Sequence, residues 1–147
     1  MDAHMNIKNV QLKAIEARRY SELKTPLNKV RIDHNSNFKR MEQQQGTHAL
    51  IDFEYTASYG PIGMIKIEGI LIFEDPKTKT IIKEWNDTRK MPNEIASALH
   101  TAIMHACVPQ AVGIAKDLRL PPPIPLPQVR LGKNPQKGGA ELGPEVA

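Results

Sequence analysis

Apolar and polar side chains alternate most clearly in the middle of the chain, over residues 49–59 and 64–74. In the first segment the odd positions from Ala49 to Tyr59 are apolar, and Leu50 is the only apolar residue at the even positions. A period of two residues is that of a strand with one buried face. The glycines and proline of residues 59–63 are typical of a turn. The two segments therefore predict an antiparallel hairpin.

Weaker strand patterns flank this hairpin. Val30, Ile32 and Phe38 fall on one side of residues 30–39, which predicts a half-buried strand. Residues 6–20 fit a strand with one bulge, and they fit a short amphipathic helix equally well. After the hairpin, the apolar residues of 81–85 allow a further short strand.

A helical pattern begins after Pro92, which suits the first turn of a helix because proline has no N–H to satisfy there. Apolar residues recur every three or four positions from Ile95 to Ala106. Pro109 is expected to kink or break this helix, since it removes the bond to the carbonyl of His105. We expect the helix to resume as far as Leu118.

The last part of the chain is rich in proline and glycine. Residues 121–127 cannot be helical and are expected to form an extended arm, which crosses its own domain or docks on a partner. Residues 129–147 have little to bury and are expected to be disordered, and residues 1–4 are interpreted as a cloning remnant. The prediction is a single α+β domain over residues 5–128. It has a curved antiparallel sheet of four to five strands with one long Pro-kinked C-terminal helix on one face.

Charge is distributed unevenly along the 147 residues, whose net charge is +4. Residues 5–45 carry nine basic and four acidic side chains, whereas residues 46–75 carry one basic and five acidic ones. If these segments are neighbouring strands, the two charge excesses compensate each other within one sheet. The acidic residues that would offset the basic strands are Asp52, Glu54, Glu68 and Glu74.

Nucleic-acid or ribosome binding is the alternative explanation of the basic segment, because Lys and Arg neutralise phosphates. The residues that would carry it are Arg18, Arg19, Arg31 and Arg40. Only Tyr20 and Phe38 lie nearby to stack on bases, which makes this the second hypothesis. A structural homo-oligomer or adaptor is a third.

Catalytic and metal-binding motifs are not evident. His100 and His105 are five residues apart, whereas a helical two-histidine metal site needs a spacing of about three or four. Cys107 is expected to be a small buried residue, and Asp52 with Glu54 is interpreted as one side of cross-strand charge pairs. We therefore expect no enzyme activity, no cofactor and no metal. The 18 or so consecutive apolar residues of a membrane helix are absent, and no signal peptide is recognised, so we expect a cytoplasmic protein without membrane insertion.

Apolar side chains occupy both faces of the predicted hairpin, while a single helix can cover only one face. Contiguous apolar patches are rarely left bare. The second face is therefore expected to meet another copy of the chain or an extended polypeptide.

Two local stretches and the order of the elements resemble the SecB family of export chaperones. The stretches are residues 65–73 (IKIEGILIF) and residues 120–126 (LPPPIPL), with the proline-containing helix between them. The resemblance implies a four-stranded sheet with a long helix, assembled as a dimer or a dimer of dimers. It also implies ATP-independent capture of unfolded chains in apolar surface grooves, linked to protein export. Docking on the SecA motor uses an acidic surface in that family, and the net basic charge here argues against it.

The side chains that we assign to client binding are large apolar ones of the hairpin and of the segment that follows it. They are Phe53, Tyr55, Tyr59, Ile65, Ile67, Leu71 and Trp85. The pattern alone leaves open whether they face a client or the helix.

Overall fold

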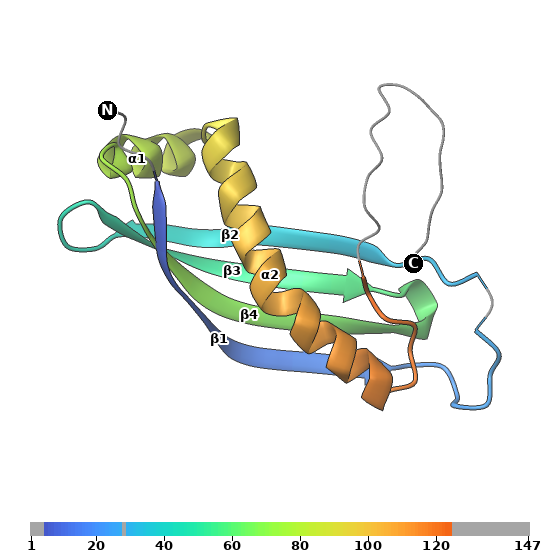
Figure 1. The fold of residues 1–147 in the computed structure, drawn as a ribbon. Coiled ribbons are helices and arrows are strands. Elements are labelled where there is room, and N and C mark those ends of the chain that lie inside the picture. Colours follow the sequence, from blue (N-terminus) through green and yellow to red (C-terminus); the bar gives the residue numbers. More distant parts are fainter. Residues whose placement is uncertain (1–4, 28, 125–147) are drawn as a thin grey trace, which may run out of the picture.

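The computed structural model describes residues 5–27 and 29–124, which form a four-stranded antiparallel sheet with helices on one face (Figure 1). The strands are β1 (Asn6–Arg19), β2 (Asp33–Gln43), β3 (His48–Ser58) and β4 (Gly63–Glu74). A short 3-10 turn (Gly60–Ile62) joins β3 to β4, and the helices α1 (Thr78–Thr88) and α2 (Asn93–Asp117) follow. The predicted α+β class and the central hairpin are confirmed.

The strand order β1-β4-β3-β2 places the hairpin in the centre and the first two strands at opposite edges. The N-terminal segment, for which the sequence allowed a strand or a helix, is a strand, because β1 pairs with β4 from Asn6 to Arg19. Its apolar alternation is broken by register irregularities between Ile7 and Asn9 and between Leu12 and Ala14. These irregularities made the sequence pattern ambiguous between strand and helix.

The prediction of a further short strand at residues 81–85 was wrong, because this segment lies in α1. Both edges of β4 are already occupied, by β1 and β3, so a strand that follows β4 finds no free neighbour beside it. Ile81, Ile82 and Trp85 instead share the buried side of α1. Their spacing fits a helical face as well as a short strand.

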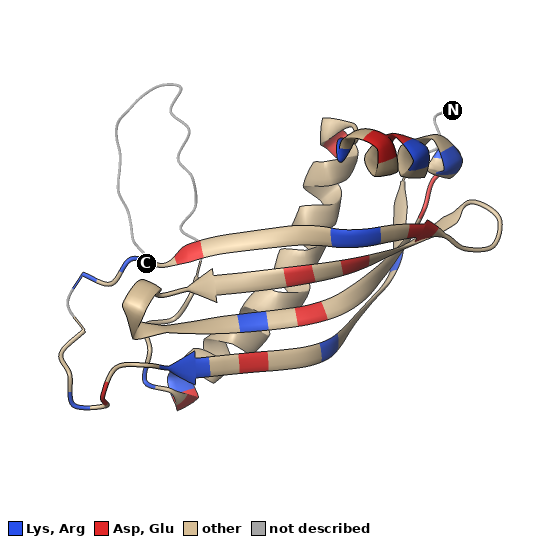
Figure 2. Ribbon diagram, turned by 180° about the vertical axis from the view of Figure 1, so that it is seen from behind, with Lys and Arg blue, Asp and Glu red and all other residues tan. Residues whose placement is uncertain are grey.

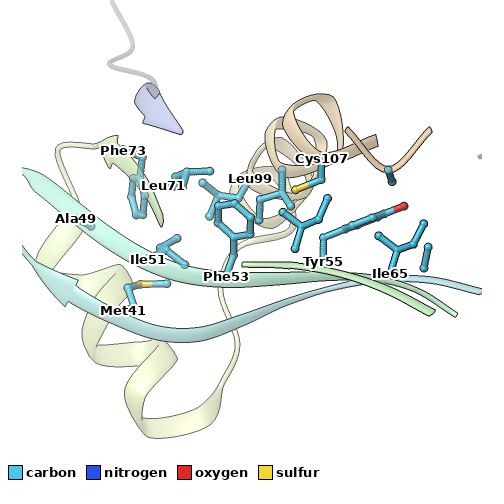
Figure 3. Close-up of a cluster of buried hydrophobic side chains, with 14 of the residues drawn as sticks. Met41, Ala49, Ile51, Phe53, Tyr55, Ile65, Leu71, Phe73, Leu99 and Cys107 are labelled. Atoms are coloured by element: carbon cyan, nitrogen blue, oxygen red, sulfur yellow. The ribbon is translucent and has the colours of Figure 1, made fainter. Parts of the chain in front are cut away.

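The core lies between the sheet and the helices (Figure 3). The odd-numbered apolar side chains of β3 and β4 are almost fully buried there, and α2 contributes a stripe of every fourth residue. The α2 stripe consists of Leu99, Ile103, Cys107, Ala111 and Ala115, all 0% exposed. Cysteine and alanine form the second half of this stripe, so α2 presents only small side chains to the sheet there.

The centre of the sheet has its closest approach at Gly69. Gly69 pairs with Phe53 on β3 and with Leu12 on β1. A Cβ atom built on Gly69 would lie 2.8 Å from Cζ of Phe53 and 2.2 Å from the carbonyl oxygen of Gln11. The Phe53 ring and the β1 backbone therefore occupy the space that any side chain at position 69 would need.

Both edge strands are irregular at the same level of the sheet. The register of β1 shifts between Leu12 and Ala14, and that of β2 shifts between Phe38 and Arg40. The residues passed over are the two lysines Lys13 and Lys39. Bulges and lysines on an edge strand both disfavour pairing with a further strand at that level.

Basic and acidic residues lie next to one another on adjacent strands, as Figure 2 shows from the side of the sheet that the helices leave uncovered. Lys39 pairs with Glu68 (3.4 Å), Arg40 with Asp52 (2.8 Å), and Lys66 bridges Glu16 and Glu54. The expected compensation between the basic and acidic strands is confirmed for Asp52, Glu68 and Glu74, whereas Glu54 pairs with Lys66 of its own hairpin. Apolar Leu50, Ile70 and Ile72 are half-buried near one end of this face, so it is far less apolar than the sequence pattern suggested.

Helix α2 contains no charged residue between Glu94 and Lys116. It runs through Pro109 without the break that we considered, because His105 and Pro109 both lie on its exposed side, where water can satisfy the carbonyl that proline leaves unpaired. In length and composition α2 could cross a membrane, and helices of protein cores meet the same criteria. In this structure it packs on all four strands.

The chain after α2 is fixed against the far end of the sheet. The Arg19 guanidinium donates to the carbonyl oxygens of Leu118 (3.3 Å) and Arg119 (2.7 Å), which lie at the C-terminus of α2. The Tyr59 hydroxyl donates to the carbonyl of Pro121 (2.6 Å), and Pro123 is buried. Residues 121–124 thus cross their own domain as expected. The remainder of the proline run, the tail 129–147 and residues 1–4 lie outside the described residues.

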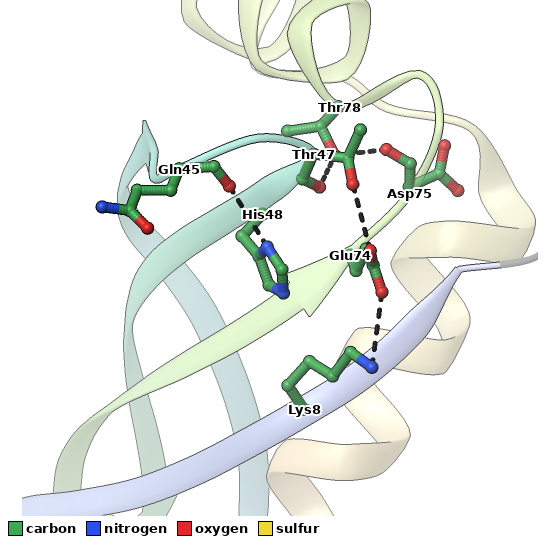
Figure 4. A network of polar contacts seen from close by, with 7 residues as sticks. All are labelled: Lys8, Gln45, Thr47, His48, Glu74, Asp75 and Thr78. Atoms are coloured by element: carbon green, nitrogen blue, oxygen red, sulfur yellow. Dashed lines mark hydrogen bonds and ion pairs between the residues drawn. The ribbon is translucent and has the colours of Figure 1, made fainter.

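A polar network fixes the start of α1 to the other end of the sheet (Figure 4). The Thr78 hydroxyl contacts the carbonyl oxygens of Thr47 (2.5 Å) and Asp75 (2.7 Å). Glu74 accepts hydrogen bonds from Lys8 (3.3 Å) and from the Thr47 hydroxyl (3.1 Å), which hold its pKa below the ordinary value. The network thereby connects β1, the turn before β3, and the chain as it leaves β4.

Replacing Gly69 by alanine is expected to destabilise the fold, because the new methyl group meets backbone atoms of β1 that cannot move aside. The expected loss is about 1–3 kcal/mol of unfolding free energy, measured by urea denaturation. Gly113→Ala is the matched control. Gly113 lies in α2, and a Cβ atom at this position would have no neighbour within 4 Å. The alanine should therefore stabilise the protein by up to about 1 kcal/mol. Equal stability of the two variants would contradict the close packing described around Gly69.

Candidate functional site

A groove of about 530 Å³ lies where edge strand β2 meets the corner between α1 and α2. We call it the corner groove. Ser36, Asn37 and Phe38 of β2 form one side, and Trp85 and Arg89 at the end of α1 form the other. The first turns of α2 close it with Asn93, Ala96 and His100. Its volume is in the range of ligand-binding clefts.

An aromatic pair forms the inner end of the corner groove. The rings of Phe38 and His100 stack with their centroids 4.5 Å apart and their planes 19° from parallel. Nδ1 of His100 is hydrogen-bonded to the Ser36 hydroxyl, which fixes the ring. Burial lowers the pKa of His100 below its ordinary value of 6.5, so the ring is neutral at neutral pH. The pair therefore offers a flat, uncharged surface.

The opposite wall is built by the end of α1. Arg89 has a φ of 63°, and its N–H donates to the carbonyl of Trp85 (2.7 Å) as the cap of the helix. Its guanidinium lies over the Trp85 ring, 4.1 Å from the centroid. Lys90 follows directly on the rim. The guanidinium of Arg89 thus lies over the aromatic wall, and Lys90 adds a second cation to the lining of the groove.

The seven side chains predicted to bind clients are buried in the monomer. Their exposures are Phe53 1%, Tyr55 0%, Tyr59 1%, Ile65 0%, Ile67 0%, Leu71 0% and Trp85 5%. The first six lie on the face of the sheet beneath α2, because the helices cover the apolar side of β3 and β4. A client reaches them only if α2 moves away. Trp85 is the one of the seven that also lines the corner groove.

The arginines of the nucleic-acid alternative do not form one patch. Arg31 pairs with Asp33, and Arg40 pairs with Glu42 and Asp52. Arg19 donates to carbonyl oxygens at the end of α2 and to those of Ser21 and Glu22. Of the four, Arg18 alone has a side chain without a hydrogen bond or ion pair among the described residues. The arrangement therefore gives this alternative no support.

Sequence reasoning missed Phe38, Arg89, Lys90 and His100 as neighbours in one groove. They come from a strand, a helix end and a second helix, and no local spacing relates them. Phe38 was assigned to a half-buried strand over residues 30–39, which is confirmed for Phe38, whereas Val30 and Ile32 precede the strand, which begins at Asp33. No pattern indicated that the strand is an edge beside a helical corner.

Metal-binding and nucleophilic groups are not brought together in the described part of the chain. No cluster of three His, Cys, Asp or Glu side chains occurs in residues 5–27 and 29–124. Cys107 is fully buried, as expected, and burial raises the pKa of its thiol to about 12. The thiol is therefore protonated and inert at neutral pH.

This chain is similar to known proteins in structure and not detectably in sequence. No family model matches the sequence, and no curated protein matches it significantly. Among solved structures, a matching chain is the Mycobacterium tuberculosis Rv1957 SecB-like chaperone, in complex with a ChAD peptide from the Rv1956 HigA1 antitoxin. The TM-score is 0.53 at 12% sequence identity, covering 80% of this chain and 83% of that chain. The chain has a SecB-like fold. That neighbour is a chaperone rather than an enzyme.

The two half-buried histidines give a pH dependence that can be measured. Burial lowers the pKa of His34, against an opposing effect of Asp33, and it also lowers the pKa of His100. The native state thus holds both rings neutral. Their contribution to stability is complete above pH 6.5, the ordinary value, and is lost as the pH falls through their lower native pKa values. Urea titrations between about pH 7.5 and about pH 5 should show this loss.

The double variant His34→Gln and His100→Gln separates this effect from general acid sensitivity. Glutamine can still meet the hydroxyls of Tyr55 and Ser36 but does not titrate. The unfolding free energy of the variant should decline less steeply below pH 6.5 than that of the wild type. Identical slopes would show that other groups cause the decline.

Proposed function

We propose that this protein is an ATP-independent holdase that binds extended, non-native polypeptide at the corner groove. The observation that carries the proposal is the groove itself, which has aromatic walls and lies directly beside an edge strand of the sheet. The SecB-like fold supports it, since the structural neighbour is a chaperone solved with a peptide. That likeness also supports a cytoplasmic location. Export and quality control are both compatible settings for such a holdase.

The chemistry of the groove suits an unfolded chain better than a folded one. β2 has a strand neighbour on one side only, and its register is regular from Asp33 to Phe38, before the irregularity at Lys39. The outward backbone groups of this regular part can pair with an extended segment. Side chains of that segment then enter the groove against the stacked rings of Phe38 and His100. Folded proteins rarely present a free strand flanked by accessible apolar side chains. Selection for the unfolded state follows without recognition of a sequence.

A holdase should suppress aggregation of an unfolded test protein without ATP, at stoichiometric amounts. Ala96→Gln should weaken this suppression, because a longer side chain fills the corner groove without entering the core. A loss of about 1 kcal/mol in binding corresponds to about fivefold weaker affinity. Light scattering of a chemically unfolded, diluted client measures the effect.

Ala98→Gln is the control for this experiment. Ala98 is also half-buried on the first turns of α2, but it does not line the groove. It should suppress aggregation as the wild type does. No suppression by the wild-type protein at equimolar subunits would exclude holdase activity.

Self-association is the second part of the proposal, as a dimer or a dimer of dimers. Ile15 is 47% exposed on edge strand β1, which is regular from Ala14 to Arg19. In an antiparallel pair of β1 strands centred on Ala17, Glu16 of one copy would lie opposite Arg18 of the other. The uncharged outer side of α2 is a further surface that a second copy can cover.

Ile15→Lys should shift the molecular mass in solution toward the 16.5 kDa monomer, because it places a charge on the β1 edge. Ile124→Lys is the matched control, with the same substitution at 55% exposure away from β1. Sedimentation velocity over a range of concentrations measures both. A monomeric wild type at high concentration would overturn this part of the proposal.

A further inference from the structure

The charged residues that line the corner groove are all basic. Arg89 and Lys90 are the only ionised side chains among the described residues of its lining, and His100 is neutral. Glu94 and Asp87 lie on the same two helices but do not line the groove, and Asp87 is paired with Lys83 (3.0 Å). A segment in the groove therefore meets positive charge beside aromatic surface.

Arg89 is held in place by two separate interactions. Its backbone caps α1 in the left-handed region, where glycine is the usual residue because it has no Cβ penalty. Its guanidinium is stacked on the Trp85 ring. A cation that is fixed before binding loses little conformational entropy when an anion arrives. The position thus carries arginine where helix geometry alone would favour glycine.

We propose that Arg89 and Lys90 make the corner groove selective for extended segments in which an acidic residue flanks an aromatic one. The aromatic ring packs on the Phe38–His100 pair, the carboxylate pairs with Arg89 and Lys90, and the backbone pairs with the edge of β2. The inference rests on the proposed function and adds the chemistry of the preferred client. A peptide fits better than a nucleotide, because the β2 side of the groove is residues 36–38, which belong to the regular part of this edge strand before the irregularity at Lys39. The backbone of that regular part can pair with another strand.

Trp85 supplies a direct readout. It is the single tryptophan of the chain and it lines the groove, so its fluorescence reports occupancy when the peptides contain phenylalanine and no tryptophan. Two peptides of equal length are compared, one with Asp and Glu around the phenylalanine and one with Asn and Gln. The acidic peptide should bind about tenfold more tightly, as expected for one or two charge-assisted hydrogen bonds. Added salt should reduce the difference.

The variant Arg89→Gly with Lys90→Gln removes both charges and places glycine at the left-handed cap, so the end of α1 is kept. It should bind the two peptides equally and leave the affinity of the neutral peptide unchanged. Lys79→Gln with Lys83→Gln makes the same change in charge on α1 outside the groove lining. This control should keep the tenfold preference.

Each other outcome has a distinct meaning. Equal affinity of the two peptides for the wild type overturns the selectivity but leaves polypeptide binding intact. No change in Trp85 fluorescence with either peptide, while aggregation is still suppressed, overturns the corner groove as the site and not the holdase function. Tighter binding of a single-stranded oligonucleotide than of the acidic peptide, lost in the Arg89 and Lys90 variant, assigns the groove to nucleic acid and overturns the proposal. Selective peptide binding without aggregation suppression overturns the holdase function alone.

Discussion

The close packing of α2 on one face of the sheet is the constraint on which the rest of the structure depends. The helix contacts all four strands and excludes water from every fourth residue along its length. A charged residue at any of these positions would have to be buried without a partner. The position of α2 also fixes the corner with α1, where the groove lies. At its other end, the bonds from Arg19 and Tyr59 hold the helix terminus and the arm against the sheet.

The two faces of the sheet differ in chemistry: the face beneath α2 is apolar, and the uncovered face is charged. Beneath α2 the side chains are apolar and interlocked, with the Phe53 ring filling the space above Gly69. On the other face Lys66, Glu54 and their neighbours satisfy one another across strands. A basic N-terminal segment therefore need not indicate a phosphate-binding surface. Within the sheet Lys8, Lys39 and Arg40 pair with acidic residues of neighbouring strands, and Arg19 is bound to carbonyl oxygens at the end of α2. The two cations beside aromatic side chains, Arg89 and Lys90, lie instead in the corner groove.

The hairpin of β3 and β4 could be predicted from the sequence because its alternation is local and nearly complete. The charge pairing followed from it, since adjacent antiparallel strands of opposite charge face each other. The direction of Tyr55 or Leu71 could not be predicted, because alternation shows that a face is apolar and not what covers it. The segment with Ile81 and Trp85 was ambiguous for a related reason. Only the strand order shows that β4 has no free edge for a further strand.

The order of strands also determines when the sheet can be completed. β2, β3 and β4 follow one another through short turns, so their pairings close small loops. β1 pairs only with β4, joining Asn6 to Glu74 and Arg19 to Gly63, and this closure costs more chain entropy. We therefore expect β1 to pair late in folding. Because Arg19 of β1 binds the carbonyl oxygens of Leu118 and Arg119, we expect the C-terminus of α2 to be fixed in the same step. Until then the free edge of β4 can accept the β1 strand of another copy, so exchange of β1 between chains is the misassembly to which this topology is exposed.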